Sequence, residues 1–311
     1  TYKFTTSLIF ILGMAVGNYM NRLISFSRVL IAAFCSFLIS SHLVAQELIR
    51  YPQPMQVYKE HHIYPLSLLK LAISKVESNY QLAPSDIFMN QGRALKQLEA
   101  GNDIEILWTM TSEAREQALN AIRIPVYKGL IGWRVFLINA DTSIDLTQPI
   151  PLEQVKNLKI VQGHDWPDTA ILKHNQFNVQ TGPHYEGLFK MLQYQRVDLF
   201  PRSIIEVWNE LKVNTASNIQ LEEHTLISYP TASYYFVSKD NQALAQVVRR
   251  GLEISLKDGS FDSLFQLHFS KMIKQAKLDT RTHYRLKNPL LTKETPLENK
   301  RLWFSPNLHE K

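Results

Sequence analysis

The chain has 311 residues and a mass of 36.0 kDa, with 45% apolar and 20% charged residues, so it is long enough for one large or two medium globular domains. Its single cysteine, Cys35, excludes both a disulfide framework and a cysteine-rich zinc site. The net charge of +6 is modest, and Lys3, Arg22 and Arg28 supply half of it, so we expect no nucleic-acid partner.

Residues 1–45 differ in composition from the rest of the chain, because they carry no acidic residue and are rich in apolar side chains. Two arginines precede the apolar run 29–39, and a less apolar stretch then ends at the small residue Ala45. This order of features predicts a secretory signal peptide that is cleaved after Ala45, and therefore a periplasmic protein. Cys35 lies in the middle of the apolar run, where no lipid attachment is expected.

A retained membrane anchor is the alternative for this segment, since residues 8–16 form a second apolar run. Neither run reaches the roughly 20 residues that a bilayer-spanning helix needs. Met20 begins a stretch that would be a complete signal peptide by itself, so we expect residues 1–19 to be an upstream extension. Export with cleavage is favoured over the anchor.

From residue 46 onward, short apolar runs alternate with segments of helical periodicity, which is the pattern of an α/β sheet protein. Apolar runs that end at turn-forming residues or at a following helix predict strands at 48–51, 104–108, 159–162 and 197–200. Apolar stripes at helical spacing and capping residues predict helices at 63–76, 92–100, 112–119, 151–158, 185–195, 204–211, 242–256 and 260–269.

Two extended runs, 122–138 and 226–237, are rich in β-branched and aromatic residues and are interrupted by proline or glycine. Between them lie about a hundred residues with a self-contained α/β pattern, which indicates an inserted lobe. Trp303 and Phe304 near the C-terminal end favour an extended tail that docks on the body over free disorder. The expected division is a signal segment at 1–45, lobe 1 at 46–124 and 236–278, lobe 2 at 125–235, and a tail at 279–311.

The chain from residue 46 to 275 resembles a bacterial periplasmic solute-binding protein of the two-lobed kind with two crossover strands. Three segments carry the resemblance: Ile122-Arg-Ile-Pro-Val-Tyr-Lys-Gly-Leu-Ile-Gly-Trp-Arg-Val-Phe-Leu-Ile138, the stretch 194–202, and the stretch 229–269 with its Lys257-Asp-Gly-Ser-Phe-Asp-Ser-Leu-Phe265. The sequence departs from the family at 51–54, Tyr-Pro-Gln-Pro, which lacks the usual acidic and aromatic ligand segment. The tail is also longer than usual.

The resemblance implies an α/β, two-lobed fold of the type 2 periplasmic-binding-protein kind with two hinge crossings. It also implies a monomeric periplasmic protein that captures a small polar solute, amino-acid-like or another carboxylate, by hinge closure. The implied partner is an inner-membrane ABC permease. The alternative is an extracytoplasmic sensory or interaction module that signals to a membrane partner.

Ligands of open α/β sheets bind beyond the carboxyl ends of the strands. A hinge with two crossings brings these edges of the two lobes face to face, so a small solute can be enclosed when the lobes close. Candidate ligand-binding residues therefore follow the strands or flank the hinge: Tyr51, Trp108, Thr109, Met110, Arg123, Trp166, Asp168 and Arg202.

Two arginines are candidates for binding a carboxylate. The planar guanidinium of Arg202 suits a carboxylate held by two hydrogen bonds in a cleft that contains little water. An internal ion pair with Glu206, one helical turn further on, is an equally good interpretation. Arg123 has the same chemistry, although it could instead fix the crossing strand.

The remaining candidates each have a structural alternative. Trp108 and Trp166 could enclose an apolar or ring-bearing part of a ligand. Core packing is favoured for Trp108, and exposure to the cleft is favoured for Trp166. Asp168 could accept a hydrogen bond from a ligand ammonium group, but a cap on a helix that starts at Thr169 is slightly favoured.

No enzyme motif is found: the sequence contains no G-x-S-x-G, P-loop, G-x-G-x-x-G or H-E-x-x-H pattern. We therefore expect a binding protein without a cofactor. One local cluster combines residue types that ligate metals, namely His164, Asp165, Asp168 and His174. Its spacing matches no standard site, and Pro167 argues against a shared helical face, so no metal is expected.

Overall fold

The computed structural model describes residue 20 and residues 47–53, 59–214 and 218–306. The expected signal peptide and its cleavage point after Ala45 lie outside these residues, apart from Met20. Within the described part, no helix is both long and apolar enough to cross a membrane. The sheets and the cleft belong to the unit that begins at Glu47.

In the residues that the structure describes, lobe 1 combines two small sheets with five helices. Its strands are β1 (Glu47–Gln53), β2 (Tyr80–Phe88), β3 (Leu107–Met110), β4 (Asn120–Ile122) and β11 (Ser233–Val237). Its helices are α2 (Lys59–Ser74), α3 (Gln91–Glu99), α4 (Glu113–Ala118), α9 (Gln242–Asp258) and α10 (Ser260–Gln275). Strands β1 and β2 pair in parallel, and an antiparallel trio has the order β3-β11-β4. The Arg50 carbonyl accepts hydrogen bonds from the amides of Glu105 and Ile106, which joins the two sheets.

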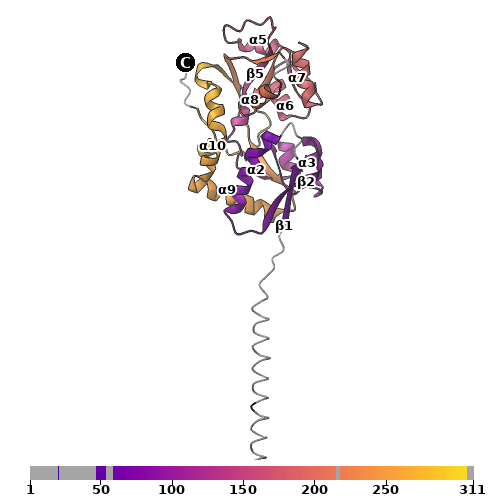
Figure 1. The fold of residues 1–311 in the computed structure, drawn as a ribbon, viewed down its shortest axis with the longest axis vertical. Coiled ribbons are helices and arrows are strands. Elements are labelled where there is room, and N and C mark those ends of the chain that lie inside the picture. Colours follow the sequence, from indigo (N-terminus) through magenta and orange to yellow (C-terminus); the bar gives the residue numbers. More distant parts are fainter. Residues whose placement is uncertain (1–19, 21–46, 54–58, 215–217, 307–311) are drawn as a thin grey trace, which may run out of the picture. The chain divides into compact units, whose positions relative to one another are not determined.

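Lobe 2 is built around the central strand β5 (Trp133–Asn139), which helices surround in Figure 1. The other strands are β6 (Ile160–Gly163), β7 (Val179–Gly182), β8 (Phe200–Ser203), β9 (Ile219–Leu221), β10 (Thr225–Ser228) and β12 (Thr282–Arg285). The helices are α5 (Leu152–Asn157), α6 (Pro167–His174), α7 (Tyr185–Gln193) and α8 (Val207–Val213). The main sheet has the order β12-β10-β5-β8, β9 also pairs with β5, and β6 pairs with β7.

The chain crosses between the lobes twice, from β4 to β5 and from β10 to β11. The two crossings are hydrogen-bonded to one another, with the Val126 amide 2.8 Å from the Ser233 carbonyl and the Tyr229 amide 3.3 Å from the Gly132 carbonyl. A side chain at Gly132 would overlap the Tyr229 carbonyl and Thr231. Glycine is therefore required where the two crossings approach most closely.

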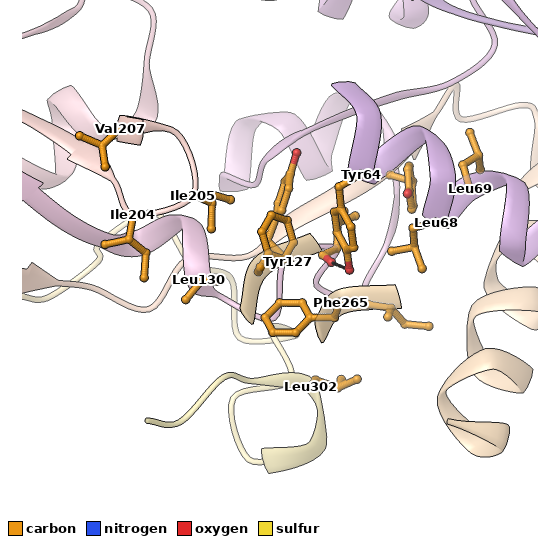
Figure 2. Close-up of a cluster of buried hydrophobic side chains, with 14 of the residues drawn as sticks. Tyr64, Leu68, Leu69, Tyr127, Leu130, Ile204, Ile205, Val207, Phe265 and Leu302 are labelled. Atoms are coloured by element: carbon orange, nitrogen blue, oxygen red, sulfur yellow. Dashed lines mark hydrogen bonds between the residues drawn. The ribbon is translucent and has the colours of Figure 1, made fainter. Parts of the chain in front are cut away.

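A continuous cluster of buried apolar side chains runs from lobe 1 through the first crossing into lobe 2 (Figure 2). In its centre, the rings of Tyr64 from α2 and Tyr127 from the crossing lie 5.6 Å apart. The Tyr64 hydroxyl donates to the Val126 carbonyl at 3.0 Å. Leu130 and Ile204 extend the cluster into lobe 2. The hinge region is thus packed like a core rather than solvated like a loop.

Each helix predicted from the sequence overlaps an observed helix, but the strands β2, β7, β9 and β12 were not predicted. Strand β2 contains Pro84, and in the described part it pairs only with β1. Proline is tolerated at such an edge because its missing N–H is not needed there. Strand β7 is only four residues long, which is too short for a recognisable pattern.

Two boundaries differ from the prediction in ways that affect the site. Helix α6 begins at Pro167, so Asp168 is inside the first turn and is not the predicted cap. Proline at the first helical position costs no hydrogen bond, since that N–H has no partner inside the helix. Strand β8 was predicted to end before Pro201, but it runs through Pro201 and Arg202 to Ser203.

Candidate functional site

A cleft of about 480 Å³ lies between the two lobes, where strand ends and helix starts of both lobes meet. Lobe 1 and the first crossing line it mainly with Gln53, His61, His62, Met89, Asn90, Gln91, Trp108, Thr109, Met110, Tyr127 and Ile131. Lobe 2 lines it mainly with Arg134, Gly163, Asp165, Trp166, Asp168, His184, Tyr185, Glu186, Arg202 and Glu206. The location agrees with the rule that ligands bind beyond the carboxyl ends of strands.

Arg115 lies directly behind the lobe 1 wall of this cleft. Its Nη1 donates to the Thr109 hydroxyl at 3.0 Å and to the Met110 carbonyl at 2.6 Å. Its Nη2 donates to Oε1 of Gln91 at 2.7 Å. All three acceptors belong to residues that line the cleft. The local sequence explains the position, because Ser112 caps α4 with its hydroxyl and α4 directs Arg115 back toward the end of β3.

Arg115 has no carboxylate as a direct partner among the described residues. Among the described residues, no ion pair within 4.0 Å involves this guanidinium, and its hydrogen bonds go to neutral acceptors. Burial lowers its pKa to about 10, and the negative charges of Asp165 and Asp168 only partly oppose this effect. A partly buried cation without a direct counter-ion lowers the stability of the folded protein. An anionic group of a ligand would therefore bind favourably on this side of the cleft.

The lobe 2 wall contains a buried ionic network around Arg134. Its Nη2 lies 2.6 Å from Oδ1 of Asp168, and both side chains are almost fully buried. The Tyr229 hydroxyl, from the second crossing, donates a short hydrogen bond to the same carboxylate oxygen. Burial by itself would lower the pKa of Arg134, but the carboxylate of Asp168 raises it above its ordinary value. Asp168 thus connects α6, β5 and the hinge.

Arg202 belongs to a second buried network in lobe 2. Its Nη2 lies 2.6 Å from Oε1 of Glu210, and its Nε is 2.9 Å from both carboxylate oxygens. The ion pair with Glu206 that the sequence suggested as an alternative is present at 3.1 Å. Burial opposes the charge, but Glu206 and Glu210 together raise the pKa of Arg202. Tyr185 donates to Glu210 at 2.7 Å and completes the network.

The indole of Trp166 packs between Arg202 of this network and the backbone of its own loop. The guanidinium carbon of Arg202 lies 4.9 Å from the indole centroid, and Phe200 stacks on the indole at 6.4 Å. A Cβ at Gly163 would come within 2.5 Å of the indole. Glycine therefore allows the ring to lie against the backbone at the end of β6. The partly exposed indole forms part of the lobe 2 wall.

The lobe 1 wall is aromatic where β1, β3 and α2 meet. The Trp108 ring lies 5.9 Å from Tyr51 and 5.1 Å from His62. Tyr51 is buried behind Trp108, and burial raises the pKa of its hydroxyl. Burial, assisted by the neighbouring His61, lowers the pKa of His62 to about 4. His62 therefore faces the cleft as a neutral imidazole near pH 7.

The structure brings six of the eight candidate residues to the cleft wall, namely Trp108, Thr109, Met110, Trp166, Asp168 and Arg202. Tyr51 lies behind this wall. Arg123 pairs with the buried Glu116, with its Nη2 2.7 Å from the carboxylate, and so anchors the first crossing to α4. This agrees with the structural alternative that the sequence offered for Arg123.

Sequence reasoning missed Arg115 and Arg134 as residues that shape the cleft, and it named Glu206 only as a partner of Arg202. A signal for Arg115 was available, since it follows the capping residue Ser112 in the first turn after a strand end. No local signal marks Arg134, which occupies the interior of a buried strand and meets its partner Asp168 only through the tertiary fold.

The cluster of His164, Asp165, Asp168 and His174 does not converge on a common point. His164 is exposed, and Asp168 is already paired with Arg134. Within the described ranges, no group of three or more His, Cys, Asp or Glu side chains could hold a metal ion.

Several solved structures have a similar fold. An ancestral arginine-binding protein bound to arginine covers 73% of this chain and 100% of its own, at 16% identity and a TM-score of 0.53. A histidine kinase sensor domain with similarity to periplasmic binding proteins covers 72% and 96%, at 14% identity and a TM-score of 0.54. The probable amino-acid ABC transporter extracellular-binding protein of Bacillus subtilis covers 71% and 96%, at 13% identity and a TM-score of 0.54.

No protein-family model matches the chain, and no curated protein matches it in sequence. At identities of 13–16%, the similarity to solved structures concerns the fold alone. The chain has the α/β, two-lobed fold of type 2 periplasmic binding proteins, with two crossings between the lobes. The fold class implied by the sequence resemblance is confirmed.

Proposed function

We propose that the protein is an extracytoplasmic binding protein, without catalytic activity, that captures a small carboxylate-bearing solute between its lobes by hinge closure. The observation that carries this proposal is the cation of Arg115 behind the cleft wall, whose direct partners among the described residues are all neutral. A ligand carboxylate would supply the missing negative charge in a partly desolvated site, where such a pairing contributes most.

The charges of lobe 2 favour a solute that also carries an ammonium group. Its two buried networks contain two guanidinium groups, Arg134 and Arg202, and three carboxylates, Asp168, Glu206 and Glu210. The carboxylates of Asp165 and Glu186 also line the wall. Oε2 of Glu206 is buried and lies 3.1 Å from Nη2 of Arg202, but the described residues donate no well-aligned hydrogen bond to it. An ammonium donor beside Glu206 and a carboxylate beside Arg115 would balance both lobes, which fits an amino-acid-like zwitterion.

The size and lining of the cleft are compatible with a solute of this kind. A volume of about 480 Å³ exceeds what a small amino acid needs, and it lies within the usual range for small-molecule sites. Trp108, Trp166, Tyr127 and Tyr185 contribute apolar ring surface to its walls. This surface favours a bulky or aromatic side chain on the solute.

The candidate residues have two roles in this proposal. Trp108, Thr109, Met110 and Trp166 contact the solute from the walls. The other four hold these walls in place through the contacts described above: Tyr51, Arg123, Asp168 and Arg202. The lobes that close on the solute follow the division expected from the sequence, 46–124 with 236–278 against 125–235, except that all of β11 belongs to lobe 1 and β12 belongs to lobe 2.

The proposal also includes export to the periplasm after cleavage at Ala45, and delivery of the solute to an ABC permease of the inner membrane. The specific observation in favour of a second role is that a histidine kinase sensor domain has a similar fold, with a TM-score of 0.54. In that role, closure on the solute would signal to a membrane partner instead of delivering cargo.

A thermal-shift screen of amino acids, short peptides and organic acids tests the proposal, because a ligand that binds only the native state raises the melting temperature. For the best solute, we expect Arg115→Met to lower the affinity by a factor on the order of 100, since it removes a charge-assisted hydrogen bond. Arg93→Met removes an exposed arginine from the neighbouring helix α3 and serves as the matched control.

Calorimetric titration gives the affinities, and circular dichroism checks that both variants are folded. Equal affinity of the folded Arg115→Met variant and of the parent protein would remove Arg115 from the site. Failure of every compound to shift the melting temperature would count against solute capture and favour an interaction module.

A further inference from the structure

The residues after α10 form an ordered segment, here named the C-terminal strap (residues 276–306), that contacts both lobes and the hinge. Its first anchor is Arg281, which is 7% exposed. Nη1 of Arg281 donates to the Glu222 carbonyl at 2.7 Å and to the Thr225 carbonyl at 3.2 Å, both in lobe 2. Its Nε donates to the Ala276 carbonyl at 2.8 Å. Arg281 thus fastens the end of a lobe 1 helix to the lobe 2 sheet.

The second anchor is a set of backbone contacts with lobe 2. Strand β12 of the strap pairs in parallel with β10, from Thr282 opposite Thr225 to Arg285 opposite Ser228. Directly after it, the Lys287 carbonyl and amide bond to the side chain of Asn175 at 2.7 and 3.1 Å. The strap is therefore an integral edge of the lobe 2 sheet.

The strap then returns to lobe 1. The Thr292 hydroxyl lies 3.3–3.4 Å from both carboxylate oxygens of Glu116, the residue that also anchors Arg123 of the first crossing. Nη2 of Arg301 donates to the Leu256 carbonyl of α9 at 2.8 Å. In Figure 2, Leu302 reaches the buried cluster beside Phe265.

The last anchor is on the hinge. The Phe304 amide donates to the Lys128 carbonyl at 2.7 Å. The Trp303 ring lies against Gly129, which has a positive φ of 74°, and a Cβ there would come within 2.6 Å of the ring. Trp133, at the start of β5, stacks on His283 at 4.9 Å and meets Phe304 edge-on at 5.8 Å.

We propose that the C-terminal strap is a clasp that fixes the angle between the lobes, so that the cleft opens only when the hinge end of the strap detaches. Rotation about the crossings moves the lobe 1 anchors of the strap relative to its lobe 2 anchors. The short chain from Lys287 to Thr292 spans at most about 18 Å when fully extended, which limits this movement. The rings of Trp303 and Phe304 occupy the hinge itself, where a rotation would have to displace them.

The inference goes beyond the proposed function, because it concerns the resting angle of the lobes and requires no solute. It is tested by measuring a distance between the lobes in the full chain without ligand. Spin labels at Lys96→Cys on α3 and Lys173→Cys on α6, both exposed positions, in a Cys35→Ser background report this distance by pulsed electron paramagnetic resonance. The parent protein is expected to give one narrow distribution.

The double variant Trp303→Ala/Phe304→Ala removes the rings from the hinge. We expect its mean distance to increase by more than the width of the parent distribution. Glu294→Ala changes an exposed strap residue and is expected to leave the distribution unchanged. A folded double variant with the parent distribution would overturn the clasp.

A second variant keeps the proposal testable if the loss of two rings prevents folding. Thr292→Val preserves the shape of the side chain but removes the hydrogen bonds to Glu116. A distribution broader than that of Glu294→Ala supports the clasp, and an unchanged distribution in this folded variant contradicts it.

Discussion

The three arginines around the cleft illustrate how differently the same side chain can be used. Arg134 and Arg202 are almost fully buried and are neutralised by carboxylates of the protein, at 2.6 Å in both cases. Breaking either pair would leave an uncompensated buried charge, which costs several kcal/mol, about 3–5. Among the residues that the structure describes, Arg115 donates its side-chain hydrogen bonds to neutral acceptors only. Its charge is therefore the one that a ligand can use most effectively.

His62 predicts a pH dependence of stability at the residue scale. Burial lowers its folded-state pKa to about 4, below the usual value of 6.5. Since the unfolded chain then binds the proton more readily, the contribution of this group is fully present above about pH 6.5 and is lost as pH falls toward 4. For a pKa shift of this size, the loss of stability amounts to about 3 kcal/mol.

Replacement of the imidazole by a ring that does not titrate isolates this effect. For His62→Phe, we expect the free energy of unfolding to fall less steeply between pH 7 and pH 4 than it does for the parent protein. Urea unfolding at several pH values measures both slopes, and other titrating groups cancel in the difference. Parallel curves for the two proteins would show that His62 does not contribute.

Element boundaries near the cleft depend on proline in two opposite ways. In α6, Pro167 starts the helix and brings Asp168 into its first turn, within reach of Arg134. In β8, Pro201 is tolerated within the strand, and its carbonyl accepts from Arg134 and from Gln162. The sequence shows where a proline lies, but the contacts with neighbouring strands decide whether the helix or strand ends at that proline.

Two glycines in helices predict opposite responses to the same substitution. A Cβ at Gly251 in α9 would overlap the Ala72 carbonyl of α2, whereas a Cβ at Gly187 in α7 would meet no atom nearer than 3.9 Å. We expect Gly251→Ala to destabilise the protein by about 1–3 kcal/mol through forced separation of the two helices. Gly187→Ala should stabilise it by about 0.5–1 kcal/mol, because alanine loses less backbone entropy.

Each of these two variants serves as the control for the other, since the chemical change is identical. Denaturant unfolding gives both free energies. A neutral or stabilising effect of Gly251→Ala would mean that α2 and α9 are not in close contact in solution.

At the scale of the whole molecule, the export proposed for this protein makes a direct prediction. Expression of the full chain in a Gram-negative host should place the protein in the periplasmic fraction, and N-terminal sequencing should begin at Gln46. A variant with charged residues in the apolar run, Leu30→Asp/Ile31→Asp, should stay in the cytoplasm unprocessed. Recovery of the protein from the membrane fraction with its first 45 residues still attached would contradict cleavage and favour the signalling role.

The sequence alone determined the α/β class, the positions of the predicted helices and the two interrupted runs that mark the crossings. These features are local, since they depend on periodicity, caps and breakers within short stretches. Trp166 was also expected to be exposed to the cleft, because residues after strands share one edge of a sheet, whereas core packing was favoured for Trp108.

Only the tertiary structure decided which charged side chains are already paired within the protein and which can still pair with a ligand. Arg202 and Glu210 are near in sequence, but Asp168 reaches Arg134 and Tyr229 across three elements. The role of the C-terminal strap was likewise not evident from sequence, because the pairing of β12 with β10 and the contact of Trp303 with Gly129 join residues far apart in the chain. Pairings of this kind are selected by packing and desolvation of the whole molecule, which no short pattern encodes.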